Sequence, residues 1–163
     1  MKCTQLFLLW LFPLSSFCVQ NTGQGAPMAA IATGGPQGQR EVRTTAYARS
    51  RHGTGKNANG SRLKAGDLSS AAADWSRFPL GTKFNICGTN QTYVVDDYGP
   101  ALVGTNKIDL CMPSLREMHH WGVRKVTIDI TEPGSYARSL AFLKPRKHVP
   151  YVRRMIKVLE QEV

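Results

Sequence analysis

Residues 71–130 read AAADWSRFPLGTKFNICGTNQTYVVDDYGPALVGTNKIDLCMPSLREMHHWGVRKVTIDI, and this stretch decides the fold. It contains several short segments in which apolar and polar residues alternate, and RKVTIDI at residues 124–130 is the clearest of them. Alternation at period two is typical of half-buried β-strands, and the turn-forming residues between the segments separate one strand from the next. No helical crossovers lie between the strands. The pattern therefore predicts an all-β fold, a small closed barrel rather than an α/β sheet.

The segment before this stretch adds a strand and a loop. Val42, Thr44 and Ala46 alternate with Arg43, Thr45 and Tyr47, which predicts a further half-buried strand. Residues 48–66 are polar and rich in glycine, so we expect a long loop between this strand and LSSAAA at residues 68–73.

Helices are expected at two places. Ser114 and Glu117 form a capping box at the start of a short helix, and Gly122 closes its far end. A second helix begins at Pro150, where apolar residues recur at i, i+3, i+4 and i+7, namely Val152, Met155, Ile156 and Leu159. The predicted fold is thus a small β-barrel with one short helix and a C-terminal amphipathic helix.

The chain is strongly basic. Its 163 residues include 21 Lys+Arg and 11 Asp+Glu, a net charge of +10, which predicts an anionic partner. Residues 138–163 hold seven Lys/Arg and two Glu, so they carry +5, half of the total. This basic tail is either a solvated helix face or a surface that docks on anionic wall or membrane polymers.

The N-terminus indicates export to the periplasm or cell envelope. Lys2 precedes an apolar run over residues 6–17 that contains Pro13 and is too short to span a bilayer, as expected for a signal peptide at residues 1–18. Cys18 raises the alternative of a lipid anchor. Residues 19–39 carry no charge and are rich in Gly, Pro, Gln and Ala, so we interpret 19–40 as a flexible linker. The barrel domain is then expected at 41–132 and a basic helical tail at 133–163.

Two cysteines remain in the predicted mature protein, Cys87 and Cys111. An even pair in an oxidising compartment permits a disulfide, and a buried thiol at Cys111 is the alternative. The adjacent pair His119-His120 is expected on the surface of the short helix rather than at a metal site, because neighbouring helix residues point in different directions. Trp121 is interpreted as a packing residue. The sequence predicts no metal and no cofactor.

Carboxylates stand out on or beside the predicted strands: Asp74, Asp96, Asp97 and Asp109. Asp109 lies between Ile108 and Leu110, so its side chain should point away from the core. A single carboxylate of this kind is usually a solvated strand residue. Several that converge around a glycine-containing loop indicate a function, because like charges repel and raise one another's pKa.

Four motifs in order carry a family resemblance. Asp74 precedes FPLGT, Asp97 opens DYGPALVG, Asp109 completes KIDL, and Trp121-Gly122 stand before VRKVTIDI. This arrangement resembles the 3D domain, named for three aspartates, of bacterial lytic transglycosylases such as membrane-bound lytic transglycosylase A and the stationary-phase survival proteins. TAYA around Tyr47 resembles the family's first strand.

The chain also departs from the family pattern. Pro100 replaces a glycine of the family loop, the loop from Asp97 to Asp109 is one residue longer, and Asp96 has no counterpart. The rare lipoprotein A domain is similar too, but it has a histidine where Asp74 stands, so the 3D family is favoured.

The resemblance implies a double-psi β-barrel that cleaves the bond from N-acetylmuramic acid (MurNAc) to N-acetylglucosamine (GlcNAc) without water and leaves a 1,6-anhydro product. By position, Asp109 is the acid/base, Asp97 tunes and orients it, and Asp74 shapes the site. Tyr47, Gly99 and Gly104 are expected to contact the substrate. The implied partner is the peptidoglycan glycan strand, bound by a monomer, and the export signal argues against nucleic acid. The alternative is a non-catalytic wall-binding or expansin-like wall-loosening module on the same barrel.

Overall fold

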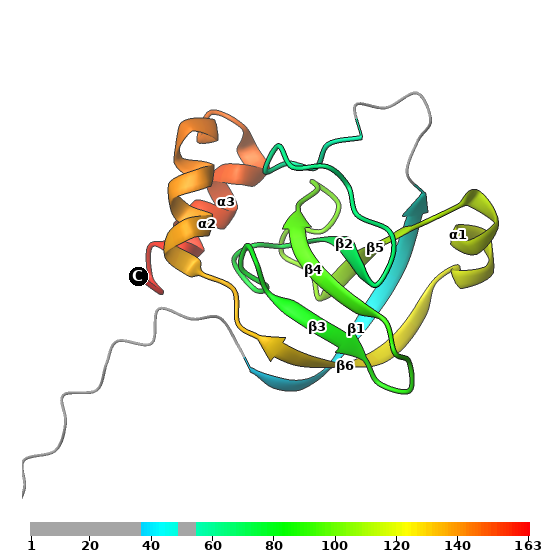
Figure 1. Cartoon of the computed structure of the whole chain (residues 1–163). Helices are drawn as coiled ribbons and strands as arrows, with labels where there is room; N and C mark the ends of the chain where they lie inside the picture. Colours follow the sequence, from blue (N-terminus) through cyan, green and yellow to red (C-terminus); the bar gives the residue numbers. More distant parts are fainter. Residues whose placement is uncertain (1–36, 49–54) are drawn as a thin grey trace, which may run out of the picture. The chain divides into compact units, whose positions relative to one another are not determined.

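The computed structural model describes residues 37–48 and 55–163. The predicted signal peptide, Cys18 and most of the predicted linker lie outside these residues. Within them, the strands close into a barrel in the order β1-β5-β2-β4-β3-β6 (Figure 1). The strands are β1 (Gly38–Ala48), β2 (Leu68–Ala73), β3 (Lys83–Ile86), β4 (Thr92–Asp97), β5 (Lys107–Met112) and β6 (Arg124–Glu132). This closed, mixed barrel confirms the prediction of a small double-psi β-barrel fold.

Strand β1 has two partners along its length. Its first part, Gly38 to Thr44, pairs antiparallel with β6, and its second part, Arg43 to Ala48, pairs parallel with β5. The strand therefore begins at Gly38, earlier than the domain start expected at residue 41. Gly38, Gln39 and Arg40 are exposed and have no apolar alternation, so their strand conformation depends on the ladder with β6.

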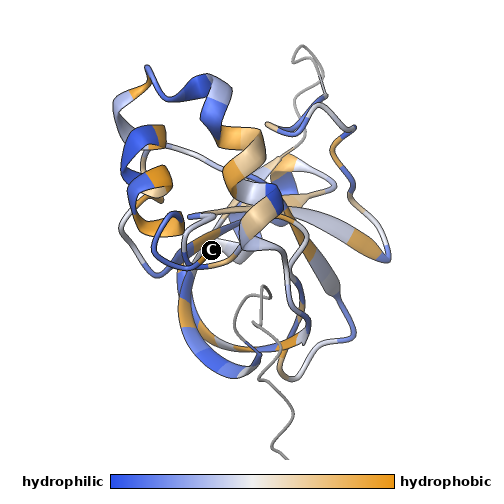
Figure 2. Ribbon diagram, turned by 90° about the vertical axis from the view of Figure 1, so that its left-hand side faces the viewer, coloured by the Kyte–Doolittle hydropathy of each residue, from blue (hydrophilic) through white to orange (hydrophobic). Residues whose placement is uncertain are grey.

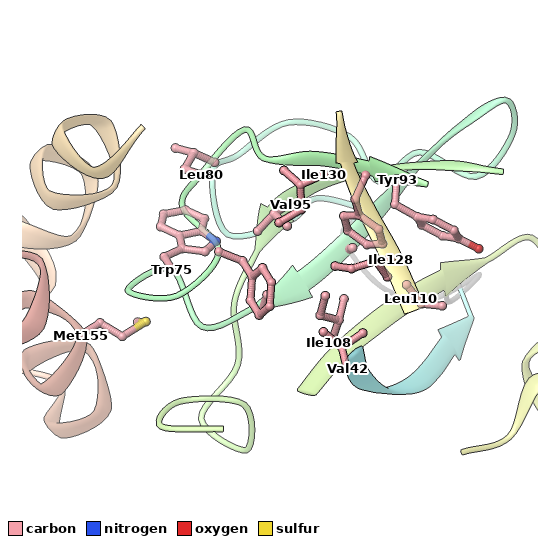
Figure 3. Close-up of a cluster of buried hydrophobic side chains, with 14 of the residues drawn as sticks. Val42, Trp75, Leu80, Tyr93, Val95, Ile108, Leu110, Ile128, Ile130 and Met155 are labelled. Atoms are coloured by element: carbon pink, nitrogen blue, oxygen red, sulfur yellow. The ribbon is translucent and has the colours of Figure 1, made fainter. Parts of the chain in front are cut away.

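The barrel interior is filled by the apolar residues of the alternating segments, among them Ala71, Phe84, Val95, Ile108, Leu110, Ile128 and Ile130 (Figure 3). Trp75 extends this core toward the C-terminal helices, because its ring meets the ring of Phe142 edge to face at 5.6 Å. Its indole N–H donates to the backbone carbonyl of Asp97 at 2.9 Å, which fixes the end of β4.

The short helix α1 (Leu115–Trp121) has the caps that the sequence predicts. The Ser114 hydroxyl accepts a hydrogen bond from the Glu117 N–H at 3.2 Å and donates to the Glu117 carboxylate at 2.7 Å. Gly122 follows the helix with φ +61°, a conformation that disfavours residues with a side chain.

The C-terminal segment contains more helix than predicted: α2 (Tyr136–Leu143), a 3₁₀ turn η1 (Lys144–Arg146) and α3 (Pro150–Leu159). Helix α3 is the predicted amphipathic helix. Helix α2 was not predicted, although Ser135 caps it by accepting from the Arg138 N–H at 3.2 Å. Helix α2 is short, and its apolar residues do not form a recognisable helical stripe in the sequence. Only the packing against the barrel shows which face of α2 is buried.

These helices belong to the same core as the barrel. Leu143, Val152, Met155 and Leu159 are fully buried, and Figure 2 shows apolar and polar residues on different sides of the helices. Ser139 of α2 is buried as well, and its hydroxyl accepts from the Leu80 N–H at 2.8 Å. The segment 133–163 is therefore an integral part of the fold rather than an appended tail. No helix in the described part is long and apolar enough to cross a membrane.

Candidate functional site

A row of four paired residues crosses one face of the barrel. Thr45 of β1 pairs with Asp109 of β5, Asp109 pairs with Ala72 of β2, and Ala72 pairs with Asp97 of β4. Residues that pair directly across strands point to the same face of a sheet. We call these four residues the carboxylate row. Since strands lie about 4.8 Å apart, the Cα atoms of Asp97 and Asp109 are separated by roughly 10 Å, with only the methyl group of Ala72 between them.

The row faces away from the barrel interior. Ile108 and Leu110, on either side of Asp109, are fully buried in the core, so the side chain between them points outward. This confirms the orientation predicted for Asp109.

A β-bulge decides where the two carboxylates of β4 point. Ala71 pairs with Val95, but Ala72 pairs with Asp97, so Asp96 is an extra residue in the ladder. Regular alternation would put Asp97 on the same face as Val95, inside the core. The bulge instead turns Asp97 outward beside Asp96, and bulges are over-represented next to active sites for this reason.

Asp97 is held by the loop before β2. Its Oδ1 accepts hydrogen bonds from the Ala58 N–H and from the Tyr98 N–H, both at 2.9 Å. Burial raises the pKa of Asp97, and these two N–H donors oppose the rise. Two backbone donors on one oxygen stabilise the ionised form, so Asp97 is suited to remain a carboxylate.

Asp109 has a different set of neighbours. Its Oδ1 accepts from the Thr45 hydroxyl at 2.8 Å. Burial raises the pKa of Asp109, and the negative charge of Asp97 raises it further, while the Thr45 hydroxyl and the charge of Lys107 lower it. A half-buried carboxyl with a raised pKa next to a second carboxylate keeps its proton to higher pH than an exposed aspartate, which favours a role as general acid/base.

Asp96 is a site residue that the family pattern did not point to. It is 3% exposed, its Oδ2 accepts from the Ser70 hydroxyl at 2.9 Å, and its Oδ1 has no partner within the described residues. Burial raises the pKa of Asp96 to about 6, with a smaller contribution from Asp97, while Ser70, Lys64 and Asn57 oppose the rise. The signal in the sequence was the first acidic residue of VVDD, but its burial depends on Ser70 of β2 and on Asn57 of the preceding loop, which lie against it.

Asp74 lies beyond the carboxylate row, after the end of β2. It is 1% exposed, and both oxygens are occupied: Oδ1 accepts from the N–H and the hydroxyl of Ser76, and Oδ2 accepts from the Gly104 N–H at 2.6 Å. Asp74 therefore holds the loop that joins Asp97 to Asp109. The site-shaping role inferred for Asp74 stays a prediction, and Gly104 is the residue through which it would act.

The two glycines of this loop shape the backbone. Gly104 has φ +79°, and its N–H is already used by Asp74. Gly99 packs close to Leu102, whose Cδ1 would lie 3.8 Å from an added Cβ. Substrate contact by Gly99 and Gly104 stays a prediction.

Tyr47 lies beside the carboxylates on β1, where it pairs with Cys111 of β5. Its hydroxyl is buried without an oxygen or nitrogen partner among the described residues. Burial raises the pKa of Tyr47 strongly, and Cys111, Asp97 and Asp96 add to the rise. Cys111 is a buried thiol, whereas Cys87 is exposed, and no disulfide joins the two. Of the two alternatives predicted for Cys111, a disulfide and a buried thiol, the structure shows the buried thiol.

Residues of α1 lie next to this face. The Trp121 indole N–H donates to the Thr44 hydroxyl at 3.2 Å, and the Arg124 guanidinium lies 4.1 Å from the Trp121 ring centroid, as expected for a packing residue. His119 and His120 are exposed. Within residues 37–48 and 55–163, no group of three His, Cys, Asp or Glu side chains is arranged to hold a metal.

Comparison with protein families gives a match over the segment that holds the three motif aspartates. The model of the 3D domain family matches residues 69–132. The matched residues are similar to the 3D domain and make up less than half of the chain. No curated protein matches the chain. The 3D domain match supports a function related to peptidoglycan.

The matched segment does not contain the whole site. Strand β1, with Thr45 and Tyr47, precedes the matched residues, and helices α2 and α3 follow them. Thr45 supplies the hydrogen bond to Asp109, so the environment of this carboxyl depends on a strand outside the family match.

Proposed function

We propose that this protein is a peptidoglycan lytic transglycosylase, which cleaves the MurNAc–GlcNAc bond and leaves a 1,6-anhydro end. The observation that carries the proposal is the carboxylate row, in which Asp97 and Asp109 flank the small side chain of Ala72. The 3D domain supports it, because this domain is associated with proteins similar to lytic transglycosylases.

The proposed reaction needs one proton-exchanging group. The protonated Asp109 carboxyl donates its proton to the glycosidic oxygen as the bond from that oxygen to C1 of MurNAc breaks. The resulting carboxylate then accepts the proton of the MurNAc 6-hydroxyl while the 6-oxygen forms a bond to C1. The anhydro ring closes, Asp109 is protonated again, and no water is consumed.

The hydrogen bonds favour Asp109 over Asp97 for this role. Asp97 accepts two backbone N–H bonds, which stabilise its charge. Asp109 accepts one hydroxyl, from Thr45, and that hydroxyl can rotate and accept a bond from a protonated carboxyl. Burial raises the pKa of Asp109 and the charge of Asp97 adds to the rise, which favours the protonated form; the same charge stabilises positive charge that develops at C1 in the transition state.

The proposed setting is the cell envelope, reached by export, with the glycan strand of peptidoglycan as partner and the protein acting as a monomer. The predicted signal peptide and the charge of +10 support this setting. Exposed cations of the C-terminal helices, among them Arg153 and Lys157, would attract anionic wall polymers and raise the local substrate concentration. Such attraction weakens with salt, since the Debye length falls to about 3 Å at 1 M.

Mass spectrometry of the products tests the proposal. Purified sacculi are incubated with the protein, and the soluble fragments are analysed. We expect anhydro-muropeptides. Reducing ends would instead indicate a hydrolase, and intact sacculi that still retain the protein would support the non-catalytic wall-binding module.

A further inference from the structure

A cleft outside the carboxylate row has no role in the proposed reaction. It has a volume of about 420 Å³ and lies between the segment after β2, the loop from β4 to β5, and helix α3. The cleft is lined by Asp74, Ser76, Arg77, Val103, Gly104, Arg154, Met155 and Val158. We call it the arginine cleft.

Two cations of the cleft are available to a ligand. Arg77 and Arg154 are exposed and come from different elements, and neither guanidinium makes an ion pair or hydrogen bond within the part of the chain that the structure describes. The carboxylate of Asp74 forms no ion pair with either guanidinium, and its oxygens accept hydrogen bonds from Ser76 and Gly104. A guanidinium binds carboxylates in a two-bonded geometry, so the cleft is suited to an organic acid.

Three of the residues that line the cleft are apolar. Val103 and Met155 contribute hydrocarbon surface, and Val158 is an exposed hydrophobic residue, with 43% of its surface accessible. A ligand that carries carboxylates together with small apolar groups therefore fits better than a bare inorganic anion.

The cleft adjoins the carboxylate row. Asp74 lies two residues beyond Ala72, about 7 Å along the chain direction of β2. Gly104 lies in the loop that connects Asp97 to Asp109. A polymer bound across the row can therefore reach the cleft with a substituent without leaving the site.

We propose that the arginine cleft binds the stem peptide of peptidoglycan, an inference that rests on the proposed function. The stem peptide is attached to MurNAc, the sugar whose bond is cleaved, and it carries carboxylates and alanine methyl groups. Arg77 and Arg154 bind the carboxylates, and Val103, Met155 and Val158 contact the methyl groups. Arg77 and Val103 lie inside the 3D domain match, whereas α3 lies outside it, so helix α3 of this chain completes the specificity.

Binding of a GlcNAc–MurNAc disaccharide with its stem peptide tests the cleft. In this ligand the sugars are linked from C1 of GlcNAc to MurNAc, and the bond that the enzyme would cleave, from C1 of MurNAc to GlcNAc, is absent. The measurement therefore does not depend on catalysis. Calorimetry should show about tenfold weaker binding for Arg154→Gln and for Arg77→Gln, in line with loss of a charge-assisted hydrogen bond. The matched control is Arg153→Gln, which removes the same charge from an exposed neighbour that does not line the cleft. Its affinity should stay within about twofold of the wild type.

A second ligand distinguishes the sources of the carboxylate. In the same disaccharide without its peptide, a free lactyl carboxylate replaces the amide that joins MurNAc to the peptide, and Arg154→Gln should leave the weaker binding of this ligand unchanged. An equal loss with both ligands would show that Arg154 contacts the disaccharide rather than the peptide, and an equal loss in Arg153→Gln and Arg154→Gln would indicate general electrostatic attraction. Either result overturns the proposal. If the peptide effect holds while sacculi yield no anhydro products, the cleft stands and the transglycosylase reaction is wrong.

Discussion

Two regions of the molecule each contain an aspartate of the family motifs, and the two aspartates have opposite environments. In the carboxylate row, Asp109 is half-buried and accepts one bond from a hydroxyl, whereas Asp74 is 1% exposed and accepts three bonds, two of them from backbone N–H groups. A carboxylate whose lone pairs are occupied by fixed donors contributes to the fold, and one with spare capacity can exchange a proton. The family motif does not distinguish these two residues, whereas their hydrogen bonds do.

The largest expected effect is on turnover. Asp109→Asn keeps the shape of the side chain and an oxygen that can accept from Thr45, but it cannot donate and recover a proton. We expect the rate of anhydro product formation to fall by roughly 10² to 10⁴. The melting temperature should stay close to that of the wild type. Activity within about threefold of the wild type would show that Asp109 is not the acid/base.

Asp74→Asn should act on stability instead. The amide group offers one acceptor where the carboxylate offered two, so either the Ser76 pair or the Gly104 N–H loses its partner. Leaving a buried donor unsatisfied costs about 1–3 kcal/mol, measurable by urea unfolding. The control is Asp67→Asn, an exposed carboxylate whose loss should change little. Unchanged stability in Asp74→Asn would remove the contrast between the two regions.

The pH dependence of stability shows what the burial of Asp96 contributes to this comparison. Its folded pKa of about 6 lies above the ordinary 3.8, so the fold favours the protonated form. Its contribution to stability is complete below about pH 4 and is lost as the pH rises through 6. Asp96→Asn has no charge to bury, so at pH 7 it should exceed the wild type in stability by roughly 1–3 kcal/mol, and the gap should shrink toward pH 4. Unfolding curves at several pH values measure this difference in the free energy of unfolding. A difference that stays constant with pH would show that the burial of Asp96 is not its cause.

The smallest expected effect concerns the pairing within the row. The negative charge of Asp97 raises the pKa of Asp109, so Asp97→Asn should lower that pKa. The alkaline limb of the pH–rate profile, where the acid becomes deprotonated, would then move to lower pH. If the limb stays in place while activity remains measurable, Asp97 serves only to hold the loop through Ala58.

Local patterns were sufficient for much of the barrel. The alternation in RKVTIDI, the capping residues around α1 and the apolar stripe of α3 all depend on neighbours within one turn or one strand, and the structure has each of these elements. The outward direction of Asp109 followed from its apolar neighbours in the same way. The order of the motifs was enough to identify the 3D domain.

Features that depend on distant partners were decided only by the tertiary structure. Period-two alternation assigns Asp97 to the core face, and the bulge opposite Ala71 and Ala72 reverses this, because the ladder between β2 and β4 skips one residue. The burial of Asp96 likewise depends on Ser70 and Asn57, which are distant in the chain. The start of β1 at Gly38 depends on β6, and the helices after residue 133 join the core because the barrel presents a surface for them. The sequence alone therefore determined which residues are available for chemistry, whereas strand pairing and helix packing decided which of them share a face and which are satisfied, because both depend on residues far apart in the chain.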